Sequence, residues 1–371
     1  MNRTEVAIVD HVGLKAGMEC YDLELYAALK KKGCLPTVYS NFPSPEENII
    51  TAFSFRVKEN IVSFILMLWT YNKVANKIKR NGIRNCILHG FRFGFWEWMI
   101  IQKMKRSGAK LFLIVHDPGS LVGISANDKW KSRIFELCEN IIVHNRYSYE
   151  HLVEKLTEGM KKKLLIIPHG NFINSTVKHS DSAAFIREHH LTRDKKYLLF
   201  FGQIKETKGL DLLLEAIAGI DPTVELIIAG RMRRHSFDKY RELIYKLKLK
   251  SRVKLFIEYI SPEMRNELFN LADAVVIPYR KVYQSGVLLM AMSYGKTVIA
   301  SELPPNKEII SDGVNGFLFE SENTKALERV IREVMENNEN REIVGKNGFQ
   351  YVKQNLDWSN IAGEWIKHIE K

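Results

Sequence analysis

A lysine with chemical potential lies in the loop that follows the apolar run Leu198–Gly202. Lys208 stands directly before Gly209 and a leucine-rich segment, which predicts a strand–loop–helix junction. A lysine in such a loop can neutralise a diphosphate as a point charge. The spacing of a Walker A motif is absent, so the loop does not predict a P-loop NTPase. Taken alone, Lys208 fits a solvated surface lysine as well.

A second candidate loop follows the run Val6–Asp10 and ends at Gly17, just before a predicted helix. A glycine there lets the backbone approach a phosphate, and the helix N-terminus adds partial positive charge. The G-x-x-x-G spacing of Gly13 and Gly17 is also that of an ordinary turn. The interpretation as an anion site therefore needs support from elsewhere in the chain.

A third loop ends at Ser285, a natural N-cap for the predicted helix that closes at Gly295. The backbone N–H groups of Ser285, Gly286 and Val287 would be free at the start of that helix and would form a second anion-binding nest. A purely structural cap has the same sequence.

Three histidines end predicted strands: His89, His116 and His169. The C-terminal ends of parallel strands are where ligands bind in α/β sheets. Each histidine by itself could be a satisfied structural residue, but three at such ends favour a role for at least one. His116 follows the strongest strand of the first half.

Twelve short runs rich in Val, Ile and Leu position these loops. Most are continuous rather than alternating, which is typical of strands buried on both faces of a parallel sheet. Six lie in each half of the chain: 6–10, 37–40, 86–90, 111–117, 141–145 and 164–168, then 198–202, 225–230, 253–259, 274–278, 297–301 and 316–319. We therefore predict an α/β protein with two Rossmann-like parallel-sheet lobes that face a central cleft. The lobes span 1–180 and 190–352, and the polar stretch 174–196 joins them.

Composition and charge limit the class of protein and the kinds of partner that it could bind. Hydrophobic residues make up 46% and charged residues 26% of the 371 residues, as in soluble globular proteins. The four cysteines form no C-x-x-C pair, which speaks against a zinc ribbon or redox motif and fits a reducing, cytoplasmic compartment. Of the net charge of +12, the first 180 residues carry +10, with 26 Lys and Arg against 16 Asp and Glu. The first lobe should meet an anionic partner, and no nucleic-acid-binding signature accompanies the charge.

In combination, the motifs resemble the family-4 glycosyltransferases of the GT-B fold over nearly the whole chain. The similar segments are 199–202 with 208–216, 228–230, 272–279, 291–301 and 308–318. The resemblance implies that Gly17 contacts the donor diphosphate, that His116 lies beside the donor sugar and that Lys208 neutralises the leaving nucleoside diphosphate. It also implies that Gly230 and the Tyr259–Ile260 turn border the base, and that a tail helix, 356–371, packs back on the first lobe. The remaining donor-binding positions are Gly202, Gln203, Gln284, Ser285, Gly286 and Val287.

Two positions depart from the family pattern. Gln203 replaces an arginine that usually follows the glycine aligned with Gly202. The E-x7-E motif is missing, with Val282 and Met290 where its glutamates would fall. A methionine sulfur is only a weak hydrogen-bond acceptor, so the ribose contacts must differ. We interpret the chain as a variant branch rather than an inactive relative.

The resemblance implies a retaining glycosyltransferase that moves a sugar from a nucleotide-sugar donor to a glycan or a lipid-diphosphate-linked acceptor in surface polysaccharide synthesis. No D-x-D motif is present, so we expect no metal and no other cofactor. Stabilisation of the leaving diphosphate would be the main catalytic requirement. A nucleotide-sugar 2-epimerase and a degenerate, non-catalytic assembly partner are the alternatives.

The segment Phe55–Arg80 and the aromatic stretch Phe91–Trp98 combine apolar and basic residues. Interfacial helices at membranes look like this. Buried helices with a charged end do too, and for Ile61–Trp69 we slightly favour that prediction. The hypothesis is a cytoplasmic protein with peripheral contact to an anionic surface at the inner face of the plasma membrane.

Overall fold

The computed structural model describes residues 3–15, 18–54, 61–119, 128–177, 182–192, 194–232 and 236–371. The chain divides into two compact units, Met1–Gly170 with Leu356–Lys371 (unit 1) and Asn171–Asn355 (unit 2). Unit 2 begins earlier than the predicted polar join. The reason is that Asn171 Nδ2 donates to the Val352 carbonyl (3.1 Å) and the Phe172 N–H donates to Ser293 Oγ (2.9 Å).

Unit 1 is built on a seven-stranded sheet in the order β3-β2-β1-β4-β5-β6-β7, and all its neighbouring strands pair in parallel. The strands are β1 Glu5–Val9, β2 Leu35–Ser40, β3 Ile49–Thr51, β4 Asn85–Gly90, β5 Lys110–Val115, β6 Asn140–Val143 and β7 Leu164–Ile166. Six of them overlap the predicted strands. The short edge strand β3 was not predicted, because three residues are too few to show a pattern.

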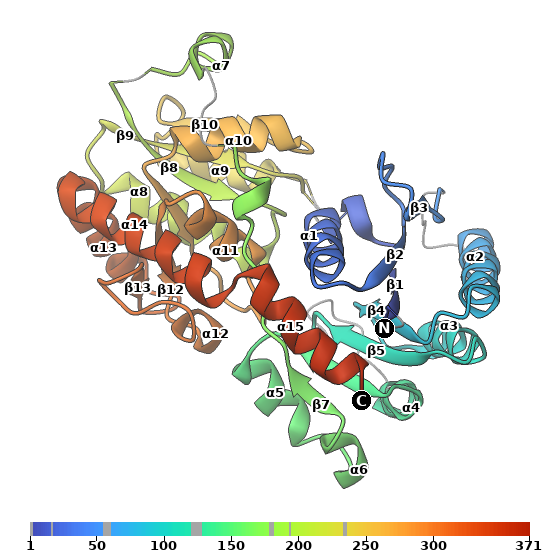
Figure 1. Ribbon diagram of the computed structural model, residues 1–371. Helices are drawn as coiled ribbons and strands as arrows, with labels where there is room; N and C mark the ends of the chain where they lie inside the picture. The colour runs from blue at the N-terminus through green and yellow to red at the C-terminus, as the bar shows by residue number, and fades with distance from the viewer. Residues whose placement is uncertain are drawn as a thin grey trace. The chain divides into compact units, whose positions relative to one another are not determined.

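Helices cover both faces of this sheet (Figure 1). Alternate residues of β1 point to opposite faces, so Val6 and Ile8 pack with α1 and α15, whereas Ala7 and Val9 pack on the side of α2 and α3. The unit-1 helices are α1 Met18–Lys31, α2 Ile61–Arg80, α3 Phe95–Lys105, α4 Asp128–Leu137, α5 Arg146–Val153, α6 Glu158–Lys161 and α15 Trp358–Ile369, with the 3-10 turn η1 Gly13–Lys15. The C-terminal helix α15 thus lies in unit 1, where Trp365 is fully buried.

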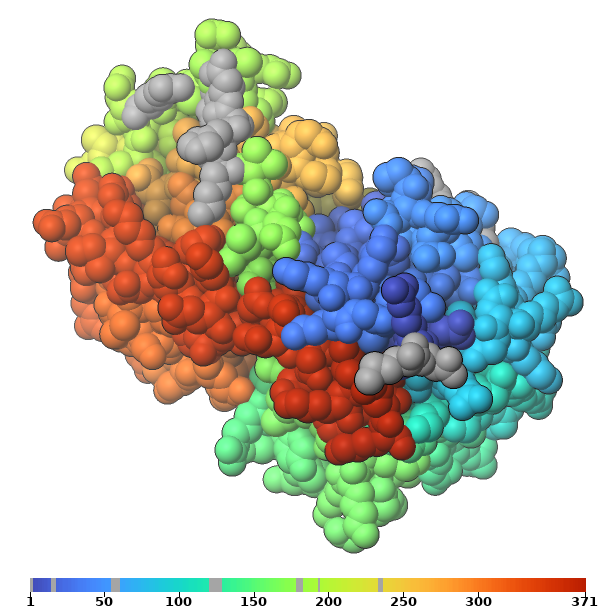
Figure 2. Space-filling model, viewed as in Figure 1, coloured from blue at the N-terminus to red at the C-terminus, as the bar shows by residue number. Residues whose placement is uncertain are grey.

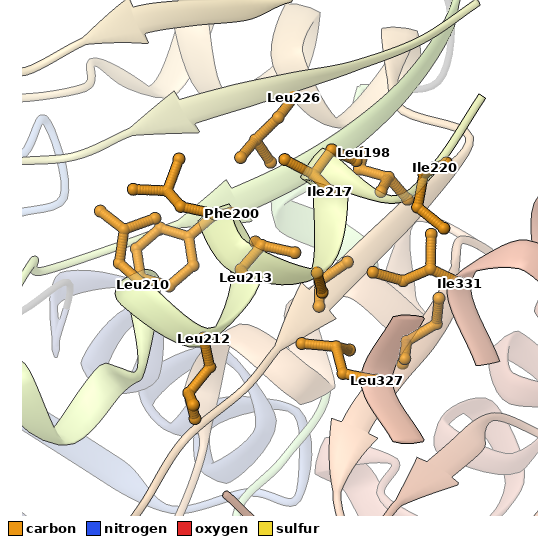
Figure 3. Close-up of a cluster of buried hydrophobic side chains, with 14 of the residues drawn as sticks. Leu198, Phe200, Leu210, Leu212, Leu213, Ile217, Ile220, Leu226, Leu327 and Ile331 are labelled. Atoms are coloured by element: carbon orange, nitrogen blue, oxygen red, sulfur yellow. The ribbon is translucent and has the colours of Figure 1, made fainter. Parts of the chain in front are cut away.

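Unit 2 holds a six-stranded parallel sheet in the order β10-β9-β8-β11-β12-β13. Its strands are β8 Lys196–Phe201, β9 Val224–Ala229, β10 Val253–Phe256, β11 Ala274–Ile277, β12 Thr297–Ser301 and β13 Phe317–Phe319. Its helices are α7 Ser182–Glu188, α8 Leu210–Ala218, α9 Asp238–Lys246, α10 Pro262–Leu271, α11 Gly286–Ser293, α12 Pro304–Lys307, α13 Thr324–Glu336 and α14 Asn338–Asn355, with the 3-10 turns η2 Ile173–Ser175 and η3 Glu206–Lys208. Leu198 and Phe200 of β8 pack against the leucine-rich helix α8, and Leu327 and Ile331 of α13 complete this core (Figure 3). The prediction of two Rossmann-like parallel-sheet lobes is confirmed.

In both sheets the strand order reverses at one point, between β1 and β4 in unit 1 and between β8 and β11 in unit 2. Open α/β sheets bind ligands beside the carboxyl ends of the strands at such a switch point. The residues after β1, β4, β8 and β11 are therefore the first places to look for function.

Candidate functional site

Three glycine-bearing or helix-starting segments of unit 2 touch one another at the carboxyl end of β8. Gly230 has φ +145°, and a Cβ there would lie 1.8 Å from the Gly202 carbonyl oxygen. Gly202 has φ +106°, and a Cβ there would lie 3.3 Å from Cγ2 of Val287. The ends of β8 and β9 and the start of α11 thus share one small area, in which both glycines keep the backbone free of side chains.

Lys208 closes the short turn η3 next to this area. The following residue, Gly209, has φ +63°, and a Cβ there would lie 1.9 Å from the Pro278 carbonyl oxygen, so the turn lies directly on the end of β11. Lys208 Nζ is 3.3 Å from the centroid of the Tyr279 ring, which gives the cation an aromatic face. Burial, followed by the nearby charge of Lys205, lowers the pKa of Lys208 well below its usual value. A bound anion would relieve that cost.

Arg280 holds the Lys208 turn in place. Its N–H donates to the Thr207 carbonyl and its Nη1 to the Glu206 carbonyl, both at 2.9 Å. Its guanidinium also binds the Asp211 carboxylate through two hydrogen bonds of 2.9 and 2.7 Å. Burial alone would raise the pKa of Asp211, but the bonds and charge of Arg280 hold it below its usual value. Arg280 was not predicted from the sequence, where its only signal is a basic residue shortly after the end of β11.

Ser285 caps α11 as the sequence predicts, since its Oγ accepts from the Leu288 N–H at 3.3 Å. The N–H groups of Gly286 and Val287 lie in the first helical turn, where no carbonyl of the same helix can accept them. The buried Tyr279 lies between Lys208 and this cap, because its ring faces Lys208 Nζ and the Ser285 side chain lies near enough to its hydroxyl to act on the pKa of the phenol. Desolvation raises the pKa of Tyr279, so the phenol stays neutral.

Some of the other predicted donor-binding residues lie at the same edge of the sheet of unit 2. Gln203 and Gln284 are half-buried in the loops after β8 and β11, and Tyr259, 54% exposed, and Ile260 follow β10. Of the two residues at the expected glutamate positions, Val282 is buried and Met290 is half-buried in α11. Gly17 lies outside the described residues.

In unit 1 the predicted histidines come together in one cluster. His116, after β5, stacks on Phe91 with ring centroids 4.6 Å apart and planes 9° apart. His89 Nδ1 lies 2.8 Å from His116 Nε2, and His169 packs edge-on against Tyr21. A fourth histidine, His144, ends β6 in the same way and contacts both His116 and His169. His144 lies in the predicted strand 141–145 but was not among the predicted functional histidines, although it stands at the same kind of position.

Only His116 of these four rings is partly exposed, whereas the others are buried. Burial, with the neighbouring histidines as a further cause, lowers the pKa of His116 well below its usual value. Burial likewise lowers the pKa of His144 to about 3 and that of His169 to about 4. The three rings are therefore neutral near pH 7.

Two buried aspartates lie behind the cluster. Asp10 accepts hydrogen bonds from the backbone N–H groups of Val12 (2.8 Å) and Gly13 (2.9 Å), and so shapes the loop after β1. Asp22 lies on α1 with Oδ1 3.1 Å from His89 Nε2, and burial raises its pKa to about 6. Ligand atoms of Asp10, Asp22 and His89 lie within 4.8 Å of one another in the described structure. Asp10 already accepts hydrogen bonds from backbone N–H groups, whereas Asp22 Oδ1 and His89 Nε2 are buried 3.1 Å apart without a well-directed hydrogen bond.

The exposed side of α2 is apolar at its start. Ile61, Val62, Ile65 and Trp69 are 55–66% exposed, so the favoured prediction of a buried helix is wrong for this segment. The opposite side of α2 is buried, and nothing in the helical period tells which of two apolar sides finds a partner. Phe95 and Trp96 at the start of α3 add to the exposed apolar area. Figure 2 shows the light-blue stretch that contains α2 at the surface.

No acidic residue occurs in α2, and its second half carries Lys73, Lys77, Lys79 and Arg80. Lys73 Nζ lies 3.3 Å from the centroid of the Trp69 ring, where the basic and apolar parts meet. Among the helices of the described residues, none combines the length and apolar character needed to cross a bilayer.

Comparison with known proteins identifies relatives of this arrangement. Residues 181–351 match the model of the family described as "Glycosyl transferases group 1". An uncharacterized glycosyltransferase of Methanocaldococcus jannaschii is 27% identical over 213 residues, which are 57% of this chain and 55% of that protein. The lipopolysaccharide 1,2-N-acetylglucosaminetransferase of Salmonella typhimurium is 25% identical over 217 residues, or 55% of this chain and 56% of that protein. The chain thus spans about half the length of these curated relatives.

Among solved structures, Anabaena HepE in complex with UDP and glucose superposes with a TM-score of 0.74 at 17% identity. The match covers 99% of this chain and 100% of that one. At this identity the likeness carries the fold, and it extends over both units.

Proposed function

We propose that this chain, which belongs to the group 1 glycosyltransferases and has the GT-B fold, transfers a sugar from a nucleotide-sugar donor to a glycan or lipid-linked glycan acceptor. Unit 2 would bind the nucleotide diphosphate and unit 1 would serve the acceptor side. The reaction would retain the anomeric configuration, as the family resemblance implies, and would use no metal, as we expect from the missing D-x-D motif.

One observation supports the proposal above all others: Lys208 lies against the ring of Tyr279, and Tyr279 lies beside the Ser285-capped start of α11 at the switch point of unit 2. A cation, free N–H groups of a helix N-terminus and side-chain-free glycines are the components that bind a diphosphate. The leaving nucleoside diphosphate gains negative charge as the bond between the anomeric carbon of the donor sugar and the phosphate oxygen breaks. Groups already oriented toward that charge stabilise the transition state more than the ground state.

The direct test is a thermal-shift panel of nucleotides and nucleotide-sugars, with UDP included because HepE was solved with it. A ligand that binds only the folded state stabilises it by about 2.7 kcal/mol at one hundred times its Kd. We expect one nucleoside diphosphate and its sugar conjugates to raise the melting temperature while the others do not. The nucleotide that stabilises is then incubated as its sugar conjugate with candidate acceptors, and release of free nucleoside diphosphate is measured.

The same panel separates the alternatives. A nucleotide-sugar 2-epimerase would be stabilised and would consume the sugar conjugate without releasing free nucleoside diphosphate. A non-catalytic assembly partner would show no stabilisation by any member of the panel, and that result would contradict the proposal.

We further propose that the exposed part of α2 contacts an anionic membrane surface that carries a lipid-linked acceptor. An apolar helix face followed by four basic residues and no acidic ones suits insertion at such an interface. We expect the protein to float with vesicles that contain phosphatidylglycerol and to remain in solution with neutral vesicles at low salt.

Trp69→Glu is expected to abolish flotation, because it places a carboxylate in the middle of the exposed apolar face. Tyr245→Glu is the matched control, since Tyr245 is an 81% exposed aromatic residue on α9 of unit 2. If both variants float like the unmodified protein, or if neutral vesicles bind equally well, α2 is not a membrane-contact surface.

A further inference from the structure

The contacts behind His116 form a continuous chain of three side chains from the interior of unit 1 to its partly exposed edge. Asp22 Oδ1 lies 3.1 Å from His89 Nε2, and His89 Nδ1 lies 2.8 Å from His116 Nε2. The His89 and His116 rings are parallel within 8°, with centroids 5.1 Å apart. Two imidazoles that share an in-plane N–H···N bond have this geometry, so the short distance is a hydrogen bond and not a face-to-face contact.

We infer that Asp22 and His89 are positioning residues that fix the tautomer of His116, so that His116 presents an unprotonated Nδ1 to a substrate hydroxyl. The contact of His116 with a substrate hydroxyl rests on the proposed function, whereas the assignment of the His116 tautomer does not. Asp22 is not among the residues that the sequence patterns single out, and His89 was singled out there only for its position at the end of a strand.

The direction of the chain follows from what each atom can donate. An ionised carboxylate only accepts and would repel a nitrogen lone pair 3.1 Å away, so His89 Nε2 must carry a proton although the contact is not a well-directed hydrogen bond. A neutral His89 then has a lone pair at Nδ1, and His116 must donate to it from Nε2. Because His116 is held neutral by burial, its second nitrogen, Nδ1, has no proton left and can only accept.

Other groups around the chain are consistent with this direction. His144 Nδ1 lies 2.9 Å from the Ile167 carbonyl and His169 Nδ1 lies 2.6 Å from the Gly170 carbonyl. A carbonyl only accepts, so these two rings carry their proton at Nδ1, the opposite tautomer. Tyr21 is a neutral phenol because burial raises its pKa, and Asp10 is held by backbone N–H groups. None of these groups supplies a proton to His116 Nε2.

Protonation of His89 would reverse the direction of the hydrogen bond between His89 and His116. A second proton at Nδ1 of His89 would face His116 Nε2, and His116 would then carry its own proton at Nδ1. Asp22 favours the charged His89 and burial opposes it, with a net rise of the His89 pKa. The assigned tautomer of His116 therefore belongs to alkaline solution, in which His89 is neutral.

Nitrogen-15 NMR of histidine-labelled full-length protein measures the tautomers directly, and no substrate is needed. At alkaline pH we expect His89 and His116 as Nε2–H tautomers, and His144 and His169 as Nδ1–H tautomers that serve as internal references. Resonances are assigned with His89→Gln, His116→Gln and His144→Gln. A His116 that carries its proton at Nδ1, or that exchanges between both forms in the unmodified protein, overturns the inference.

Asp22→Ala tests the origin of the bias. The variant should remain folded, because it removes a buried carboxylate whose raised pKa shows that ionisation is disfavoured in the fold. We expect His116 to become a mixture of tautomers, while the His144 and His169 signals stay unchanged. A single Nε2–H form of His116 in Asp22→Ala would show that Asp22 does not set the tautomer.

Once transferase activity has been measured, kinetics of variants test whether Asp22 and His89 act on the reaction through His116. Asp22→Ala is expected to lower kcat by less than His116→Ala, and the double variant should equal His116→Ala, since Asp22 acts only through His116. Additive losses in the double variant would contradict a positioning role. If the tautomers are as stated but no donor is turned over by the unmodified protein, the proposed function fails and the assignment of the chain stands.

Discussion

Lys208→Ala is expected to reduce turnover of the nucleotide-sugar by about 10²- to 10³-fold, the loss seen when one preorganised charge-stabilising group is removed from a transition state. Lys208 Nζ contacts the face of Tyr279 and forms no ion pair within the described part of the chain. Its lowered pKa shows that the ligand-free protein carries the charge at a cost. The variant should therefore melt no lower than the unmodified protein, although it loses the stabilisation that nucleoside diphosphate provides.

Lys250→Ala is the matched control for this measurement. Lys250 is exposed and lies just before β10, at the end of the sheet opposite to the loop that carries Lys208. Its replacement should change neither turnover nor the thermal shift with nucleotide. Turnover close to normal in Lys208→Ala, with the control also normal, would remove the lysine from the mechanism.

The sheets of both units could be predicted from the sequence because their strands are buried on both faces. Such strands consist of continuous apolar runs, and residues such as Val275 and Val276 have no polar neighbour that could suggest a helix or loop. The edge strand β3 lacks this signal, as Ile49 and Ile50 are its only apolar residues. The exposed side of α2 was mispredicted for a different reason: hydrophobic spacing identifies a helix but not whether another element covers it.

The site was predictable where a local pattern carries it and not where distant segments supply the partners. Gly202, Lys208 and Ser285 lie in segments with recognisable turn and cap chemistry. Arg280 and Asp22 act through side chains that meet residues far away in sequence, Asp211 and His89. A lone arginine or a buried helical aspartate has no pattern of its own, so only the fold reveals which partner it has.

Gly230→Ala is expected to destabilise unit 2 by about 2–6 kcal/mol, the sum of a strained backbone and an overpacked contact at about 1–3 kcal/mol each. A methyl group at this position would lie 1.8 Å from the oxygen and 2.7 Å from the carbon of the Gly202 carbonyl. Both atoms are backbone at the end of the central strand β8, so they cannot rotate away as a flexible side chain would. The strand ends must separate, and the loop that precedes Lys208 must move with them.

The distribution of tryptophan makes this loss assignable to one unit. All six tryptophans lie in unit 1, at 69, 96, 98, 130, 358 and 365, so tryptophan fluorescence follows unit 1 whereas far-UV circular dichroism follows both units. In urea we expect Gly230→Ala to lower the midpoint of the transition seen by circular dichroism. Gly363→Ala is the control, because Gly363 lies inside α15 with no atom within 4 Å of an added Cβ, and alanine there should stabilise by about 0.5–1 kcal/mol. An unchanged circular-dichroism midpoint in Gly230→Ala would mean that the backbones of β8 and β9 can part without cost, and the close approach of Gly202 and Gly230 could then not be what shapes the diphosphate site.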